Sequence, residues 1–255
     1  MTAVFKKMRK KAVKIAKKDK IIDVIFPLRC PACDKPVPYF HRQRGICPEC
    51  EKSFSLIRGA RCCLCGRMLA GNEEELCGDC RLNGRRHYYT KGIALYEYND
   101  AMRKAIYRFK YEGRREYAEF FGRAMARQFG NAVRRAGVEG IIPIPLHPKR
   151  EAERGYNQAE LLARAFGEGL KIPVYEKYVI RVRNTAPMKA LEGARRQNNL
   201  KKAFKIGQND VKLNITIVVD DIYTTGSTID AVAKVLLEAG TSRVYFMTLA
   251  IGKDF

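Results

Sequence analysis

The chain has 255 residues, with 49 Lys and Arg against 27 Asp and Glu, and a formal net charge of +22 at pH 7. Because 46% of the residues are hydrophobic and 30% are charged, the composition excludes an intrinsically disordered chain. The basic excess excludes an acidic solvating protein and favours polyanionic partners. Charge alone does not choose among phosphates, nucleic acid and an anionic membrane surface.

The first segment, residues 1–28, is the most basic. Residues 1–20 hold nine Lys or Arg and one acid, and their apolar residues recur at helical spacing. This pattern predicts a basic helix, which either lies on DNA or on an anionic membrane or docks on its own protein. No apolar run approaches the roughly 18 residues that span a bilayer, and residues 21–26 are too short for a signal peptide. We therefore expect a cytoplasmic protein, with only peripheral membrane contact through residues 1–20.

The second segment, residues 29–86, carries the cysteines. Eight of the nine cysteines form four Cys-x-x-Cys pairs, and Cys63 is left over as a spare thiol. Such pairs in a reducing compartment indicate zinc, since two Cys-x-x-Cys turns complete a tetrahedron of thiolates. Four thiolates leave no open position, so we predict two structural Zn²⁺ sites in a double zinc ribbon. The spacing does not decide whether the ligand sets are sequential or interleaved. The predicted ligands are Cys30, Cys33, Cys47, Cys50, Cys62, Cys65, Cys77 and Cys80.

The remainder, residues 87–255, has the pattern of a globular α/β domain. Apolar strands alternate with helices, which is typical of a parallel sheet with helices on its faces. The predicted strands cover 92–99, 141–145, 174–182, 215–221 and 244–251. The predicted helices cover 116–133, 158–169 and a third that Ser227 caps and Gly240 ends.

The stretch VVDDIYTTGST (218–228) carries the clearest chemistry. A buried strand delivers Asp220 and Asp221 to its carboxyl end, and a tight loop then opens into a helix. The backbone N–H groups of such a loop cradle a phosphate at the positive helix end. The two acids suit a sugar diol or Mg²⁺. The alternative is that the Asp and Thr side chains only cap the turn.

The same stretch resembles the phosphoribosyl pyrophosphate (PRPP) motif of type I phosphoribosyltransferases. From about Ile21 the whole chain resembles the ComF family, also called amidophosphoribosyltransferase-like competence proteins. The matching pieces are the double Cys-x-x-Cys ribbon, Phe109–Gly113, Ile142–His147, Arg154–Gln158, Thr185–Phe204 and the PRPP loop. The resemblance implies a type I phosphoribosyltransferase-like parallel sheet flanked by helices, with an N-terminal double zinc ribbon.

The resemblance also implies roles for individual residues. Asp220 and Asp221 would bind the ribose hydroxyls of PRPP, directly or around Mg²⁺. Arg195 or Arg196, in a mobile loop over 183–200, would reach the pyrophosphate and take part in catalysis. The 5′-phosphate would be held by Thr224, Thr225, Gly226, Ser227 and Thr228, and the leaving pyrophosphate would be neutralised by Lys149, Arg150 and Arg154. The alternatives are that Arg154 only pairs with an acid and that Asn157 and Gln158 only start a helix. Where this chain has Met188 the family usually has Gln.

Three functions stay open at this point. The first is a phosphoribosyltransferase that displaces pyrophosphate at the ribose anomeric carbon, with an acceptor the sequence does not reveal. The second, implied by the family, is an accessory of DNA uptake that works on single-stranded DNA with a helicase partner, although aromatic residues are not obviously interleaved with the basic ones. The third is a module that binds PRPP without turnover. We expect Asp221→Asn to leave the fold intact and Cys47→Ser to unfold the ribbon.

Overall fold

A computed structural model describes residues 27–69, 71, 75–82, 87–182, 203–207 and 211–252. The basic helix predicted over residues 1–20 and the predicted loop over 183–200, with Arg195 and Arg196, lie outside the described residues. The division of the chain at residues 28 and 86 stays a prediction.

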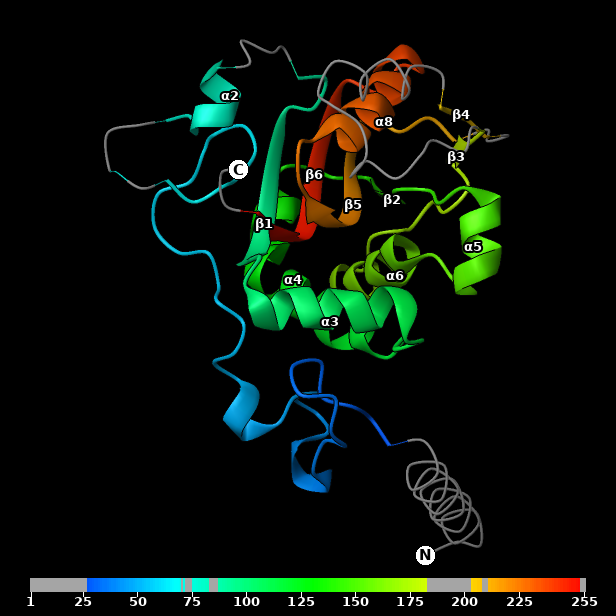
Figure 1. Ribbon diagram of the computed structural model, residues 1–255. Helices are drawn as coiled ribbons and strands as arrows, with labels where there is room; N and C mark the ends of the chain where they lie inside the picture. Colours follow the sequence, from blue (N-terminus) through cyan, green and yellow to red (C-terminus); the bar gives the residue numbers. More distant parts are fainter. Residues whose placement is uncertain are drawn as a thin grey trace, which may run out of the picture.

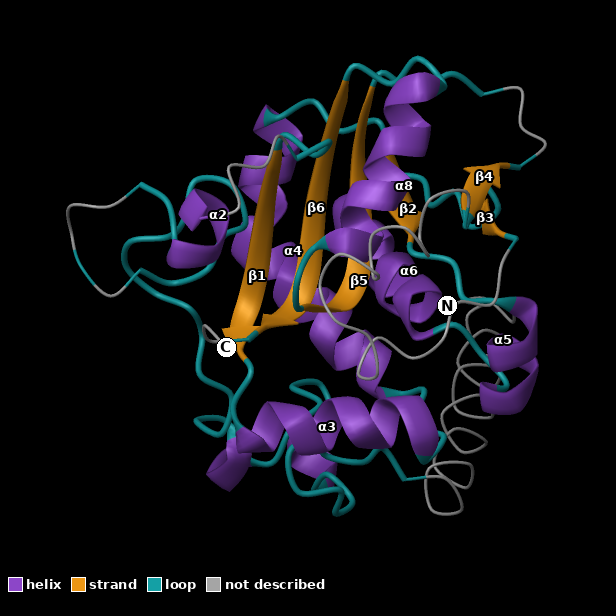
Figure 2. Cartoon of the chain, turned by 45° about the horizontal axis from the view of Figure 1, so that its top comes forward, coloured by secondary structure: helices purple, strands orange, loops and turns teal. Residues whose placement is uncertain are grey.

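The centre of the fold is a four-stranded sheet in which every pair is parallel. Its order is β1 (Lys91–Glu97), β6 (Arg243–Ile251), β5 (Ile215–Tyr223) and β2 (Gly140–Pro143) (Figure 2). The two central strands, β5 and β6, are buried on both faces, which explains their continuous apolar runs. The predicted α/β class with a parallel sheet is confirmed.

Helices cover both faces of this sheet (Figure 1). One face carries α3 (Asp100–Tyr111), α4 (Tyr117–Arg135) and α6 (Gln158–Leu170), and the other carries α8 (Ser227–Glu238). The short α5 (Pro148–Arg154) follows β2. Along β5, Ile217 and Val219 face α4 and α6, whereas Val218 faces α8. No helix within the described ranges is both long and apolar enough to cross a membrane.

The packing of α4 on α6 depends on a glycine. A Cβ at Gly122 of α4 would lie 2.4 Å from the Cβ of Ala165 on α6. Only glycine therefore lets these two helices approach as closely as they do, and their contact supports one whole face of the sheet.

The two halves of the ribbon pack in different places (Figure 1). The first unit contains the 3-10 helices η1 (Tyr39–His41) and η2 (Pro48–Cys50), and its Cys30, Cys47 and Phe54 join the core under α3 and α4. The second unit contains α2 (Gly78–Leu82), and its four cysteines join the core under α8. Each unit is too small to form a hydrophobic core of its own, so its buried residues pack into the cores of the α/β domain.

The strand predicted over 174–182 is wrong in extent. Val174 forms only an isolated parallel bridge to Ile141, and a turn closed by the Tyr178 N–H on the Tyr175 carbonyl then takes the chain away from the sheet. The remainder, β3 (Val179–Arg181), pairs antiparallel with β4 (Phe204–Ile206). The apolar pattern alone does not show this turn.

Two details of the helices also differ from the sequence analysis. Ser227 is the first residue of α8 rather than its cap, because Gly226 takes the N-cap position in a left-handed conformation (φ +73°). The helix α3 was not predicted, although Asn99 caps it by accepting a hydrogen bond from the Met102 N–H. An Asn before a helical apolar pattern is a start signal that could have found it.

Candidate metal centres and active site

The eight paired cysteines form two separate clusters, each with all its sulfurs within 4.8 Å of one another. The ligand sets are therefore sequential: one holds Cys30, Cys33, Cys47 and Cys50, and the other holds Cys62, Cys65, Cys77 and Cys80. Thiolates at the corners of a Zn²⁺ tetrahedron lie about 3.8 Å apart, given Zn–S bonds of about 2.3 Å. The observed Sγ–Sγ distances are 3.8 Å for Cys33–Cys47 and 3.6 Å for Cys65–Cys77. Both clusters thus fit structural Zn²⁺.

The thiol chemistry supports the same assignment. Burial, with the neighbouring sulfurs, raises the pKa of Cys47 and of Cys50 to about 12. A hydrogen bond from Cys65 lowers the pKa of Cys62 to about 4, whereas burial above all raises that of Cys80 to about 12. Four thiolates therefore cannot coexist in either cluster without a cation, and zinc binding would release their protons. The spare Cys63 is exposed.

Each unit is fixed to the α/β domain by polar contacts as well as by packing. In the first unit, Asp34 accepts hydrogen bonds from Arg114 at 2.7 and 2.8 Å and from the Tyr117 hydroxyl at 2.6 Å. Burial opposes ionisation of Asp34, but these two partners outweigh it and hold its pKa below the usual range. In the second unit, the carbonyl of Leu64 accepts a hydrogen bond from the Gly92 N–H of β1 at 2.6 Å.

The acidic pair lies inside the carboxyl-terminal part of β5, and its two side chains face opposite sides of the sheet. Asp221 is 2% exposed and points toward α3 and α6. There it forms an ion pair with Lys110 of α3 and accepts a hydrogen bond from Gln158 of α6 at 3.1 Å. Arg154 of α5 in turn donates to Gln158. A chain of polar groups thus links the pyrophosphate candidate Arg154 to the acidic pair.

The surroundings shift the pKa values of the two acids in opposite directions. Burial of Asp221 works against its charge, but Lys110 and the hydrogen bond from Gln158 prevail, so its pKa is lowered. Burial and the neighbouring charge of Asp221 raise the pKa of Asp220 well above the usual value. The surroundings therefore favour the charged form of Asp221 and the neutral form of Asp220, and a cation bound beside Asp220 would favour its ionisation.

The loop after β5 forms the second half of the candidate site. Asp220 and the loop residues line a small hollow of about 30 Å³, and Thr225 and Ser227 are joined by a 2.9 Å hydrogen bond between hydroxyls. No side chain among the described residues caps α8, so the N–H groups of its first turn face the loop. The loop members that the sequence analysis assigned to phosphate, Thr224, Thr225, Gly226, Ser227 and Thr228, all line this hollow.

Gly226 is required for this loop shape. Its φ of +73° is unfavourable for other residues, and a Cβ there would lie 2.5 Å from the hydroxyl of Tyr223. The Tyr223 hydroxyl is itself hydrogen-bonded at 3.0 Å to the hydroxyl of Tyr89, which follows the second ribbon unit. The loop therefore rests on a buried tyrosine pair.

Two further residues singled out in the sequence, Arg150 and Asn157, lie outside the hollow. Arg150 lies near Arg181, whose pKa is lowered by burial first and then by the Arg150 charge. Asn157 caps α6 by accepting from the Ala159 N–H and donates to the Ile144 carbonyl at 3.0 Å, which is the structural role that sequence analysis left open.

The sequence pattern by itself gives Lys110 no role. It lies within the matching stretch Phe109–Gly113, but only the position of α3 against β5 shows that its ammonium faces Asp221.

Comparison with known proteins agrees with these features. Residues 21–81 match the model of the double zinc ribbon domain. Competence protein F of Haemophilus influenzae is 31% identical over 82% of this chain and 91% of its own length. Competence protein ComFC of Bacillus subtilis is 31% identical over 76% of this chain and 79% of its own. DNA utilization protein YhgH of Escherichia coli is 28% identical over 78% of this chain and 94% of its own.

Among solved structures, the chain is similar to a hypoxanthine phosphoribosyltransferase from Trypanosoma cruzi. The TM-score is 0.33 and the identity is 10%, over 53% of this chain and 68% of that one.

Proposed function

This chain belongs to the family of competence protein F and ComFC, and on that premise we propose that it binds PRPP with Mg²⁺ at the loop between β5 and α8. One observation carries the proposal. The two acids at the end of β5 are followed directly by a loop whose shape requires Gly226, and no side chain caps the start of α8 among the described residues. An anion bound there would meet free N–H groups and the positive end of the helix dipole.

Different residues would bind different parts of PRPP. Asp220, which lines the hollow, would contact the ribose hydroxyls or Mg²⁺, and Asp221 would act beside it, held in its charged form by Lys110 and Gln158. The loop 224–228 would hold the 5′-phosphate. Arg150 and Arg154 on α5, with Arg195 and Arg196, would neutralise the pyrophosphate.

The chemistry of this arrangement is electrostatic. Displacement at the anomeric carbon breaks its bond to the pyrophosphate oxygen, and the guanidinium groups stabilise the charge that builds up on that oxygen. Mg²⁺, when bound, adds positive charge to the same leaving group. If no acceptor is used, the same site would act as a PRPP sensor.

We infer the wider role from the names of the relatives, which are competence and DNA utilization proteins. The chain would act in DNA uptake, on single-stranded DNA and with a helicase partner. The reduced thiols that its zinc sites need suit the cytoplasm. Residues 1–20 would supply a basic contact to DNA or to a membrane surface.

Titration calorimetry with PRPP, with and without Mg²⁺, tests the proposal. Zinc-loaded protein should bind PRPP in a Mg²⁺-dependent way, and Asp220→Asn should abolish binding. Asp100→Asn, an exposed acid on α3 that pairs with Arg103, is the matched control. No binding by the folded protein would refute the proposal, and pyrophosphate release in an acceptor screen would separate an enzyme from a sensor.

A further inference from the structure

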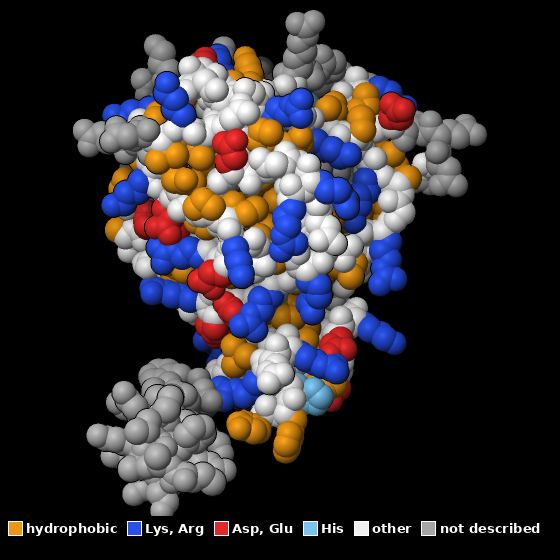
Figure 3. Space-filling model, turned by 180° about the vertical axis from the view of Figure 1, so that it is seen from behind, with side chains coloured by type: hydrophobic (Ala, Val, Ile, Leu, Met, Phe, Trp, Pro, Cys, Tyr) orange, Lys and Arg blue, Asp and Glu red, His pale blue; other side chains and the backbone are white. Residues whose placement is uncertain are grey.

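The tip of the first ribbon unit exposes two adjacent aromatic rings. Phe40 is 92% exposed and Tyr39 is 60% exposed, and the rings lie edge to face with centroids 5.8 Å apart. Figure 3 shows hydrophobic side chains protruding at the end of the molecule that this unit forms, next to a histidine. Adjacent exposed rings form a contiguous apolar patch, and such a patch at the tip of a unit is a candidate interaction surface.

Folding does not explain these two rings. The neighbouring Val37 is buried in the core of the unit, and the zinc ligands fix the backbone on either side. Tyr39 and Phe40 belong to neither hydrophobic core. Their exposed ring surface is therefore accessible to a contact outside the chain.

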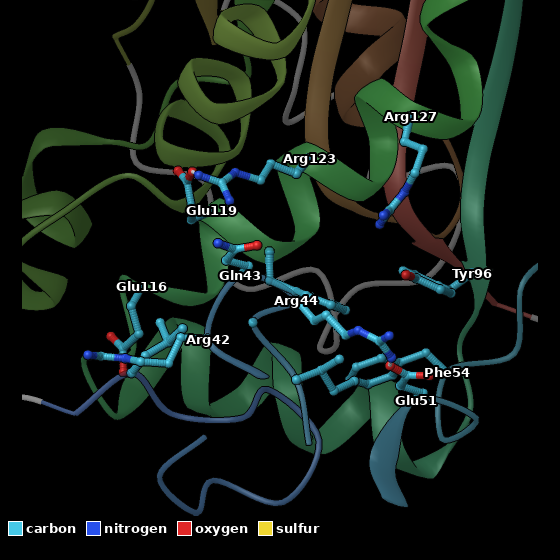
Figure 4. A pocket seen from close by; sticks show the side chains of 14 residues that line it. Arg42, Gln43, Arg44, Glu51, Phe54, Tyr96, Glu116, Glu119, Arg123 and Arg127 are labelled. Carbon is cyan, nitrogen blue, oxygen red and sulfur yellow. Dashed lines mark hydrogen bonds and ion pairs between the residues drawn. The ribbon is translucent and has the colours of Figure 1, made fainter. Parts of the chain in front are cut away.

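The chain that follows them forms one wall of a cavity of about 620 Å³. Its wall runs from Arg42 to Ile46, α4 forms the opposite side, and Phe54 and Tyr96 line it with aromatic surface (Figure 4). The volume lies in the range of small-molecule sites, roughly 300–1,000 Å³, and accommodates a nucleotide. It lies beside the first ribbon unit, apart from the loop between β5 and α8.

The cations around this cavity are available to a ligand. Arg44 pairs with Glu51 at 2.6 Å, and Arg123 pairs with Glu119 at 2.5 Å, all four being exposed. Such exposed pairs contribute at most about 1 kcal/mol and exchange readily for phosphate. Arg127 also lines the cavity, and within the part of the chain that the structure describes it has no ion-pair partner.

We propose that the tip and the cavity together form a binding surface for single-stranded nucleic acid. Unpaired bases stack on Tyr39 and Phe40, and the backbone continues into the cavity, where Arg44, Arg123 and Arg127 contact phosphates. Stacking aromatics beside a positively charged groove are the common means of binding single strands. A duplex hides the faces of its bases, and two rings beside a polar cavity are too little apolar surface for a bilayer.

This inference rests on the proposed DNA-handling role, and one experiment separates the two. Zinc-loaded full-length protein is titrated against a labelled oligothymidine strand and a labelled duplex across a salt series. Phe40→Ala and Tyr39→Ala should each weaken single-strand binding about 5- to 150-fold, the range for loss of one base–aromatic stack. Arg127→Gln should make the salt dependence less steep, by about 0.7 in the magnitude of the slope of log affinity against log salt concentration.

Tyr107→Ala is the matched control, because Tyr107 is 56% exposed on α3, outside this surface, and its loss should leave affinity unchanged. No single-strand binding by the wild type would overturn both the DNA-handling role and this surface. Binding that Phe40→Ala and Tyr39→Ala leave intact would overturn the surface alone. If the same two variants lose binding to anionic vesicles but keep binding to the strand, the surface binds membranes, and the choice of nucleic acid as the partner is overturned.

Discussion

Replacing Lys110 by Met removes the cation that faces Asp221 and keeps most of the buried aliphatic volume. The Asp221 side chain is only 3% exposed and the Lys110 side chain 19%, so the carboxylate left behind has little access to water. Removing one partner of a buried ion pair typically costs about 3–5 kcal/mol.

The structure also sets a limit on this cost. In the variant, the Asp221 carboxyl can avoid a buried charge by taking up a proton. With an unfolded pKa of about 3.9, protonation of this carboxyl at pH 7 costs about 4 kcal/mol. At pH 5 the same proton costs only about 1.5 kcal/mol. In the wild type the pKa of Asp221 is lowered, so the stability from its ionisation is present above the unfolded pKa and is lost as the pH falls through the folded value. In Lys110→Met the folded pKa is raised, so the variant becomes more similar to the wild type as the pH falls.

Urea unfolding followed by circular dichroism at pH 7 and pH 5, with zinc present, measures this difference. Lys110→Met should lose about 3–4 kcal/mol at pH 7 and clearly less at pH 5. Asp221→Asn should lose less, because the Lys110 side chain is 19% exposed and the Asp221 side chain only 3%. The double variant should recover most of the stability. Lys104→Met, an exposed lysine on the same helix, is the control and should change stability by less than about 0.5 kcal/mol. A cost at pH 7 below about 1 kcal/mol, or one independent of pH, would refute the reasoning.

Three further predictions concern the loop and the two zinc units. Gly226→Ala should weaken PRPP binding in calorimetry, since its Cβ would lie 2.5 Å from a hydroxyl, whereas Gly113→Ala, with a similar φ of +70° and open space, should not. Asp34→Asn breaks the bidentate pair with Arg114 and should cost about 1–3 kcal/mol above pH 5, with faster amide exchange in the first unit. That cost should vanish as the pH falls through the lowered pKa of Asp34. Cys65→Ser should reduce the zinc content from two ions to one per chain, and retention of two ions by metal analysis would contradict the assigned ligand set.

The acidic pair illustrates how far a local pattern reaches. The stretch from Val218 to Thr228 predicts a strand, two acids, a tight loop and a helix, and the structure has all four in that order. A strand also implies that the adjacent Asp220 and Asp221 face opposite sides of the sheet, but the pattern does not show which partners each side chain meets. Lys110 and Gln158 come from helices more than 60 residues away in the chain, so only their packing on β5 shows that they hold Asp221.

By itself the sequence determined the zinc ligands and the class of the fold, because Cys-x-x-Cys turns and apolar strand runs depend on neighbours within a few residues. Only the tertiary structure decided which cysteines cluster together and that the two ribbon units join the cores on opposite sides of the sheet. It also decided that Tyr39 and Phe40 face solvent beside a large cavity. These features depend on which surfaces the sheet buries, and burial is set by contacts between residues far apart in the chain.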